Sequence, residues 1–247
     1  MTTQRTPQPE PETTGTVDFT VGSETYQTWY KVVGNMKESG LTPLVIANGF
    51  THVRFQLDDF RTFELYIAEL QNLVLKLGVH ENHDLLGNSW RGALALLFIV
   101  ALQPRGLRRL ILANSYASMA LCEAGCRKLI EKLLKEIRET SEGCEREGKT
   151  RTQEYKDAEL YFIQRHANIR CADMDTTVYL AFHGPSEFYC AGNQKDFDVN
   201  PRLHEVRQPT LGIPKAKWVQ LAVASHQPFS KNRIDTSNRY FEVVGAS

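Results

Sequence analysis

The sequence has no excess of charge of either sign, because its 29 Lys and Arg residues balance 29 Asp and Glu residues. Electrostatic binding to nucleic acid or to an anionic membrane usually needs a basic excess, and the balance gives no support to either partner. The chain also has no apolar run near the ~20 residues that a membrane-spanning helix needs. We therefore expect neither nucleic acid nor a membrane as a partner.

Cysteine is scarce and irregularly placed. There are five, an odd number, and no two have C-x-x-C spacing: Cys122, Cys126, Cys144, Cys171 and Cys190. This pattern indicates ordinary reduced thiols and favours neither a disulfide framework nor a zinc site. We expect no metal and no cofactor.

The first 16 residues lack the apolar centre of a secretory signal and are rich in Pro, Thr, Gln and Glu. We predict that residues 1–16 form a disordered tail. Together with the missing membrane span, this composition leads us to expect a cytoplasmic protein.

Residues 17–117 predict an α/β arrangement. Alternating runs over 16–21 and 26–33 flank Gly22 and predict a β-hairpin. The short apolar run over 43–47 is typical of a strand buried on both faces. The following pattern predicts a helix over 63–77, a strand over 84–86, a helix over 92–102 and a strand over 107–114. This alternation favours a mainly parallel sheet with helices on its faces.

The segment after residue 117 changes character. It is highly charged, its apolar residues recur at helical spacing, and Glu139–Gly143 predicts a break between two helices. An apolar run over 217–223 predicts a late return to the sheet. We therefore divide the chain into the tail 1–16, a first core part 17–117, a helical cap 118–200 and a last core part 201–247.

The most informative motif is Gly87-Asn88-Ser89-Trp90-Arg91-Gly92, set between two apolar runs. It predicts a strand, a sharp turn and a helix with Ser89 at the apex, which is the geometry of a nucleophile elbow. Small residues flank such a serine because side chains would clash across the strained turn. Arg91 occupies one of those positions, and we expect its side chain to clash across the turn. The alternative is a serine in an ordinary turn between strand and helix.

A serine nucleophile needs a histidine that accepts its proton. His226 follows the apolar run that ends at Val223–Ala224, and enzymes with this elbow place their histidine in a loop after the last strand. The alternative for His226 is a loop histidine without a role. We expect His83, His166 and His183 to be structural or solvated.

Several segments together carry a family resemblance: 85–90, 106–115, 184–188, 195–199, 201–203, 215–219 and 225–226. With them, most of residues 16–245 resembles the proline iminopeptidase family of α/β-hydrolases, and within it the fungal members. The resemblance implies an α/β-hydrolase fold with a helical cap. It also implies metal-free cleavage of an N-terminal residue, a small amide or an ester through an acyl-serine intermediate. Fungal secondary metabolism, where such hydrolases are recruited, is a further possibility.

The resemblance also implies roles for four residues. Ser89 matches the nucleophile, His226 the general base, and the backbone N–H of Trp90 one donor of the oxyanion hole. Glu187 matches a cap glutamate that pairs with the free α-amino group of the substrate. The implied partner is a small-molecule or short-peptide substrate.

The sequence departs from the family in ways that affect catalysis. The His-Gly-Gly-Pro-Gly loop, which supplies the second oxyanion donor, is absent, and Asn48 or Gly49 is the candidate replacement. Residues 209–213 run directly into 214–217, where relatives have the catalytic Asp. We therefore predict a core shortened by internal deletions. The remaining candidates for the acid are Asp196, Asp198 and Asp235.

These departures leave the activity open. Loss of one oxyanion donor costs ~10²–10³ in turnover, and a triad without a working acid loses ~10⁴. The alternative to a serine hydrolase is a catalytically degenerate relative that binds a small molecule or partner without hydrolysis. A shortened gene product that folds poorly is a third interpretation.

Overall fold

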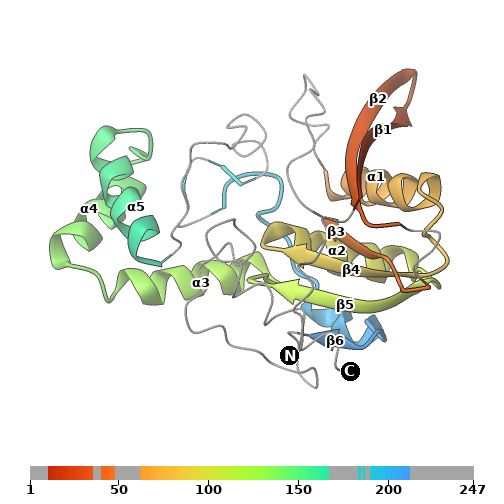
Figure 1. Ribbon diagram of the computed structural model, residues 1–247. Coiled ribbons are helices and arrows are strands. Elements are labelled where there is room, and N and C mark those ends of the chain that lie inside the picture. The colour runs from red at the N-terminus through yellow and green to blue at the C-terminus, as the bar shows by residue number, and fades with distance from the viewer. Residues whose placement is uncertain are drawn as a thin grey trace, which may run out of the picture.

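The computed structural model describes residues 11–35, 40–47, 62–166, 183–184, 186 and 190–211. Within them lies a parallel four-stranded sheet of order β3-β4-β5-β6, and a separate antiparallel hairpin of β1 and β2 (Figure 1). The sheet strands are β3 (Leu44–Ala47), β4 (His83–Asn88), β5 (Leu107–Ala113) and β6 (Thr210–Leu211). The α/β class and the parallel sheet predicted from the sequence are confirmed.

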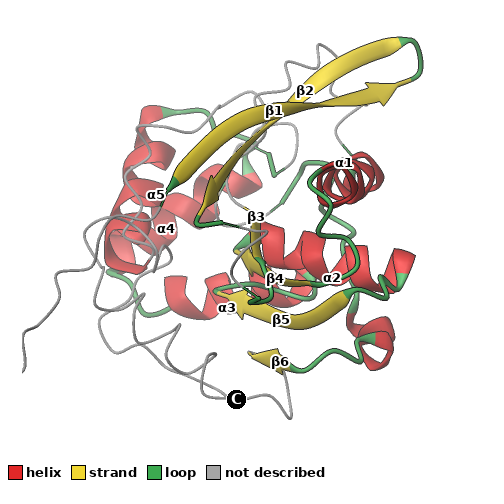
Figure 2. Ribbon diagram, turned by 45° about the vertical axis from the view of Figure 1, so that its right-hand side comes forward, coloured by secondary structure: helices red, strands yellow, loops and turns green. Residues whose placement is uncertain are grey.

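Both faces of the sheet are buried where β4 and β5 lie side by side, whereas Ile46 of β3 is 49% exposed. Leu85 and Leu110 belong to the core beneath the helices α1 (Phe63–Lys76) and α2 (Trp90–Leu102). Their chain neighbours Leu86 and Ile111 point to the opposite face and pack with Leu211. Successive side chains of a strand alternate between faces, so adjacent leucines serve two separate cores. Figure 2 shows α1 and α2 side by side on one side of the sheet.

The sequence of α1 explains its bounds and its orientation. Thr62 caps the helix by accepting a hydrogen bond from the N–H of Leu65 at 3.3 Å. Leu70 and Val74, one turn apart, are buried against α2 and the sheet. The chain leaves the helix through Gly78, whose φ of 71° is the left-handed conformation that glycine adopts readily.

The hairpin is longer than the sequence analysis predicts. β1 (Glu12–Val21) pairs with β2 (Glu24–Val33), so residues 12–16 of the predicted tail are part of a strand. Pairing with β2 gives these backbone groups hydrogen-bond partners, and Glu12 also forms an ion pair with Lys31 at 2.7 Å. A buried hydrogen bond from Thr28 Oγ1 to Glu69 Oε1, 2.7 Å long, attaches the hairpin to α1.

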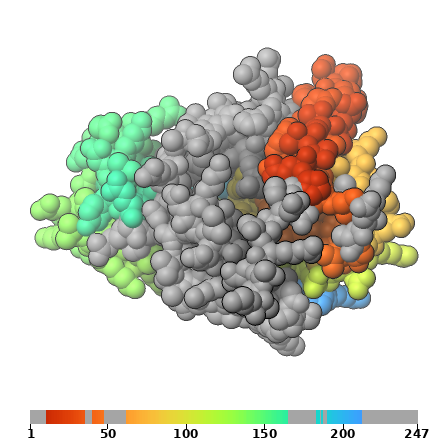
Figure 3. All heavy atoms as spheres, viewed as in Figure 1, coloured from red at the N-terminus to blue at the C-terminus, as the bar shows by residue number. Residues whose placement is uncertain are grey.

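Three helices follow the sheet strand β5: α3 (Met119–Ile130), α4 (Lys135–Arg146) and α5 (Gln153–His166). They have their own apolar cluster, which includes Leu133, Tyr155 and Phe162. Figures 1 and 3 show these helices and the N-terminal hairpin at opposite ends of the molecule. They occupy the segment in which the sequence predicts a helical cap.

The helix break predicted at Glu139–Gly143 is wrong, because α4 runs through this segment. Ser141 donates a hydrogen bond from Oγ to the carbonyl oxygen of Ile137 at 2.8 Å, and its side chain is therefore satisfied inside the helix. The apolar face that includes Ile137 and Cys144 packs into the cluster of the three helices. This packing outweighs the weak helix propensities of Thr140, Ser141 and Gly143.

The chain returns to the sheet beside the point where it left. The N–H of Met119 donates to Phe197 O, and the N–H of Val199 donates to Ala117 O, each at 2.8 Å. A 3₁₀ helix (Asn200–Glu205) then packs on α2, where Arg202 Nη2 donates to Val100 O at 2.7 Å. The entry and exit of the helical segment are thus tied together next to β5. Among the described helices, none combines the length and apolar character needed to cross a bilayer.

Candidate active site

The structure places Ser89 at the turn between the end of β4 and the start of α2. Its backbone has φ 59° and ψ −133°, a conformation that residues other than glycine rarely adopt. Such a conformation costs on the order of 1–3 kcal/mol and persists only where the surrounding structure enforces it. Strained residues of this kind cluster at functional sites, and a serine in this setting is the hallmark of a nucleophile elbow.

Three hydrogen bonds hold the backbone of Ser89. Its N–H donates to the carbonyl oxygen of Ala113, the last residue of β5, at 2.9 Å. Its carbonyl oxygen accepts from the N–H of Gly92 and from Oγ of Ser115, both also at 2.9 Å. Two of the three partners lie at the end of the neighbouring strand, so the sheet itself enforces the turn.

The glycines of the motif are required at Gly87 and Gly92. A Cβ atom at Gly87 would lie 2.5 Å from the carbonyl oxygen of Arg91, and one at Gly92 would lie 2.0 Å from Ser115 Oγ. Both distances are impossible for a real Cβ atom. The expectation that Arg91 harms the turn is wrong, because the close approach falls one residue later, where the sequence has Gly92.

Trp90 is the first residue of α2 and is buried. The N–H groups of the first turn of a helix point out of its N-terminal end, which carries a partial positive charge. The described first turn of α2 has no acidic side chain to offset that charge. The backbone N–H of Trp90 therefore belongs to a helix terminus suited to a developing oxyanion.

Aromatic side chains surround this turn. The Tyr66 and Trp90 rings pack edge to face with centroids 5.2 Å apart, and the Arg91 guanidinium lies 5.3 Å from the centre of the Trp90 ring. Burial lowers the pKa of Arg91 to about 10, against a smaller opposing effect of Tyr66. Phe197, near the end of the cap segment, contacts both Phe63 and Tyr116. The cap exit thus forms one wall of an apolar environment beside the elbow.

The remaining predicted site residues lie outside the described part of the chain. They are His226, Glu187, Asn48, Gly49 and Asp235. The two described candidates for the acid, Asp196 and Asp198, are exposed, and Asp198 Oδ1 accepts a hydrogen bond from the N–H of Asn200 at 3.0 Å. In the described ranges, no group of three or more His, Cys, Asp or Glu side chains is placed to hold a metal ion.

Sequence reasoning missed Ser115 and the aromatic residues as parts of the site. Ser115 stands directly after the strand predicted over 107–114, and Asn114 before it has a left-handed φ of 47°. The sequence does carry a signal for Ser115: it is a polar residue directly after the strand that pairs with the strand of the elbow. The contact of Phe197 with Phe63, by contrast, joins segments far apart in the chain, and no local pattern predicts it.

Comparison of sequences finds related proteins named proline iminopeptidase, although no protein-family model matches the chain. The Lactobacillus delbrueckii subsp. bulgaricus protein is 28% identical over 203 residues, which cover 70% of this chain and 68% of the relative. The Clostridium botulinum protein is 25% identical over 279 residues, which cover 89% of this chain and 93% of that relative. The Levilactobacillus brevis protein is 29% identical over 265 residues, with 83% and 88% covered.

Comparison with solved structures leads to the same group of proteins. The crystal structure of VinJ superposes with a TM-score of 0.78 at 26% identity, covering 97% of this chain and 99% of VinJ. The proline iminopeptidase of Mycobacterium smegmatis gives a TM-score of 0.64 at 26% identity, with 80% and 77% covered. The chain therefore has the α/β-hydrolase fold and is a relative of the proline iminopeptidases.

Proposed function

We propose that this protein is a serine hydrolase of the proline iminopeptidase type, acting on an N-terminal residue, a small amide or an ester. The single observation that carries the proposal is the backbone of Ser89, held at φ 59° and ψ −133° between β4 and α2. Residues held in a strained backbone conformation cluster at functional sites, and the neighbours of Ser89 maintain its conformation through three hydrogen bonds. The names of the sequence relatives support a hydrolase of this type.

In the proposed reaction, Ser89 Oγ attacks the carbonyl carbon of the substrate while His226 takes the hydroxyl proton. The N–H of Trp90 stabilises the negative oxygen of the tetrahedral intermediate. The carbon–nitrogen or carbon–oxygen bond to the leaving group then breaks, and His226 gives the proton to that group. Water, deprotonated by His226, hydrolyses the acyl-serine ester and restores the Ser89 hydroxyl.

We propose that Glu187 recognises the substrate. Its carboxylate would pair with the free α-amino group, so that amino-terminal substrates are preferred over acylated ones. The catalytic acid stays unassigned.

A shortened core is part of the proposal. Its support is that the match to the Clostridium botulinum relative extends over 279 residues, more than the 247 of this chain, so some of the relative's residues have no counterpart here. If the acid lies among them, turnover falls by up to ~10⁴ while the elbow and helix terminus remain. We therefore expect slow hydrolysis, and a protein that binds without hydrolysis is the alternative.

Two fluorogenic amides test the proposal: one with a free N-terminal proline and its N-acetylated counterpart. The proposal predicts slow hydrolysis of the free amine, much weaker hydrolysis of the acetylated form, and loss of both in Ser89→Ala. Ser23→Ala, at an exposed position in the hairpin turn, is the matched control and keeps wild-type rates. Hydrolysis that survives Ser89→Ala contradicts the proposal. Saturable binding of the free amine without turnover supports the alternative.

A further inference from the structure

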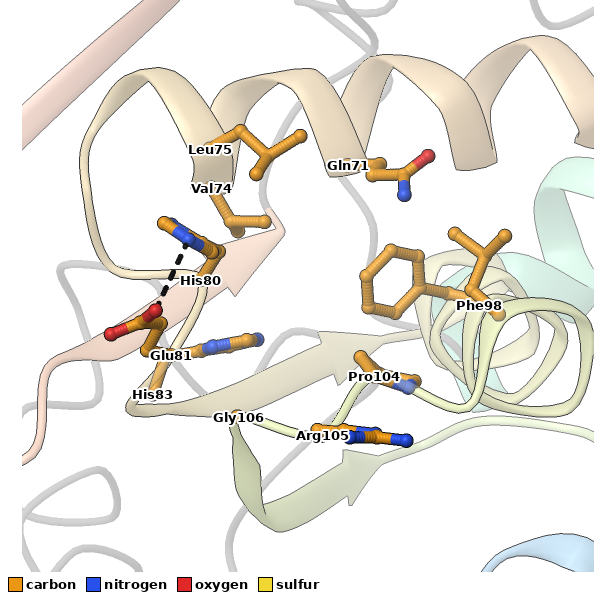
Figure 4. A pocket seen from close by; sticks show the side chains of 11 residues that line it. Gln71, Val74, Leu75, His80, Glu81, His83, Phe98, Pro104, Arg105 and Gly106 are labelled. Carbon is orange, nitrogen blue, oxygen red and sulfur yellow. Dashed lines mark ion pairs between the residues drawn. The ribbon is translucent and has the colours of Figure 1, made fainter.

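A cavity of about 230 Å³ lies at the far end of the sheet from Ser89, between the C-terminal turns of α1 and α2 (Figure 4). His83, which begins β4, lines this cavity. β4 carries the chain from there to the elbow, a length of about 17 Å at ~3.3 Å per residue. Ligands of open parallel sheets bind at the carboxyl ends of the strands, so the groups that recognise a substrate at Ser89 come from the cap end and not from this cavity.

The residue before Glu187 is anchored to the cap helices. Ser186 is 1% exposed, and its Oγ lies 2.5 Å from the hydroxyl oxygen of Tyr155, which is buried on α5. Glu187 itself lies outside the described residues, but a trans peptide bond keeps consecutive Cα atoms about 3.8 Å apart. The anchor of Ser186 therefore limits the positions that are open to Glu187.

A carboxylate defines the donors and acceptors of this anchor. The Tyr155 hydroxyl lies 3.1 Å from Glu145 Oε1, and because a carboxylate only accepts, the single hydrogen of the hydroxyl goes to Glu145. Ser186 Oγ then donates to the oxygen of Tyr155. Burial raises the pKa of Tyr155, which keeps its hydroxyl protonated as the donor to Glu145. Glu145 also pairs with Arg127 at 3.7 Å, so the anchor joins α3, α4 and α5.

A second anchor follows at Cys190. Its backbone N–H donates to Glu123 Oε1 on α3 at 2.6 Å, and its side chain is buried in the core cluster against which Tyr116 packs. Tyr116 also packs against Trp90, the residue after Ser89. The chain is therefore tied to the cap helices at one end of this short stretch and to the core beside the elbow at the other.

We propose that Tyr155 is a positioning residue for substrate recognition: by fixing Ser186, its hydroxyl holds the Glu187 carboxylate where the free α-amino group of the substrate binds. This role rests on the proposed function, in which Glu187 recognises that amine. An ion pair with an ammonium group depends on distance and direction, and an anchored backbone lowers the cost of ordering the carboxylate when the substrate binds. Tyr155 itself does not touch the substrate, because it is fully buried in the cluster of the three helices.

Tyr155→Phe tests this role, because it removes one hydroxyl and keeps the ring packed in the cluster. Titration calorimetry measures the Kd of the full-length protein for L-prolinamide and for N-acetyl-L-prolinamide. We expect the wild type to bind the free amine about tenfold or more tightly than the acetylated form, and Tyr155→Phe to lose about fivefold in affinity for the free amine alone. Ser186→Ala removes the other partner of the hydrogen bond and is expected to have the same effect. Tyr161→Phe, the same change at a partly buried position of the same helix, is the matched control and keeps wild-type affinities.

Glu187→Gln separates positioning from a structural defect. This variant is expected to abolish the preference for the free amine, and adding Tyr155→Phe to it then changes neither affinity further. A structural defect would instead weaken the binding of both amides equally, add to the effect of Glu187→Gln and slow the reaction of Ser89 with a fluorophosphonate. Each of these results overturns the proposal, as does a wild-type preference in Tyr155→Phe. Circular dichroism verifies that each variant is folded, and Ser186→Ala carries the test if Tyr155→Phe is not.

The proposed hydrolysis is measured separately from this role. Hydrolysis of both fluorogenic amides without a preference for the free amine overturns the role of Tyr155 and leaves the hydrolase in place. The opposite result is a wild-type protein that neither hydrolyses the amides nor reacts with the fluorophosphonate, yet prefers the free amine in binding. If Tyr155→Phe reduces that preference, the proposed hydrolysis is contradicted and the role of Tyr155 is supported.

Discussion

Ser115 Oγ donates a 2.9 Å hydrogen bond to the carbonyl oxygen of Ser89 and so joins the end of β5 to the elbow. The same carbonyl oxygen accepts from the N–H of Gly92, and both lone pairs of the oxygen are used. Ser89 therefore keeps its strained backbone because its neighbours hold it from two sides. The turn at Ser89 is thus a property of two adjacent strands and not of one hexapeptide.

Removing the Ser115 hydroxyl tests this relationship. We expect Ser115→Ala to lower the free energy of unfolding by about 1 kcal/mol, the usual net worth of one hydrogen bond. Urea denaturation at neutral pH measures the change, and Ser23→Ala, in the exposed hairpin turn, is the control that stays within about 0.5 kcal/mol of wild type. Equal stabilities for the two variants would contradict the account.

Gly92 and Arg91 give a second test, because the structure assigns the steric requirement to only one of them. Gly92→Ala places a Cβ atom 2.0 Å from Ser115 Oγ, and we expect it to cost about 1–3 kcal/mol through forced displacement of the turn. Arg91→Ala removes the contact with the Trp90 ring, worth about 0.5–2 kcal/mol, and we expect it to leave the turn intact.

The readout for this pair is the accessibility of Ser89 to an acylating reagent. Arg91→Ala is expected to keep the wild-type rate of acylation, whereas Gly92→Ala is expected to slow it sharply. The reverse order of the two variants would show that the small-residue requirement lies at position 91 after all.

Local pattern was sufficient to predict most of the elements that position Ser89. The helix over 63–77 and the strands on either side of α2 are found within one or two residues of the predicted bounds. These segments have strong apolar periodicity, and their packing agrees with their local preference. The alternation of Leu85 and Leu86 between two faces follows directly from strand geometry.

Where prediction from sequence failed, contacts between distant segments decided the outcome. Residues 12–16 have the composition of a tail, yet they pair with β2. Residues 139–143 have weak helix propensity, yet the face that includes Cys144 is buried in the cluster of three helices. The small-residue requirement at Gly92 depends on Ser115, which lies on another strand end and is invisible to a motif.

His83 makes stability depend on pH with a definite sign. Burial lowers its pKa in the folded protein below the reference value of 6.5, despite the opposing hydrogen bond to Val79. Between those two pKa values the unfolded chain binds a proton that the folded protein does not, so stability is full above pH 6.5 and falls as pH drops below it. Urea denaturation at pH 7.5 and pH 5.5 measures the difference. His83→Asn removes this contribution, and an unchanged pH slope in that variant would contradict the assignment.

Asp84 and Arg109 form an ion pair at the start of the sheet. Asp84 Oδ2 accepts from Arg109 Nη2 at 2.7 Å and from Nε at 3.0 Å, and the Asp84 side chain is only 5% exposed. Arg109→Met leaves a buried carboxylate without its cation, and we expect the free energy of unfolding to fall by about 2 kcal/mol. Breaking a fully buried pair costs about 3–5 kcal/mol, and the cost is smaller here because Arg109 is partly exposed to solvent.

A second substitution checks the origin of that loss. Asp84→Asn in the Arg109→Met background replaces the unpaired carboxylate with a neutral amide and is expected to recover about half of the lost stability. The comparison is made by chemical denaturation of the wild type, both single variants and the double variant. A double variant less stable than Arg109→Met would show that the charge of Asp84 is not the cause.

The central claim is that Ser89 is an activated nucleophile on an elbow built by two strands. Reaction with a fluorophosphonate probe, followed by mass spectrometry of the labelled peptide, tests it most directly, with His226→Ala measured alongside. The account predicts one adduct, located on Ser89, and labelling that disappears in both Ser89→Ala and His226→Ala while their circular dichroism spectra match the wild type. A folded wild-type protein that takes up no label, or takes it up at another residue, would contradict it.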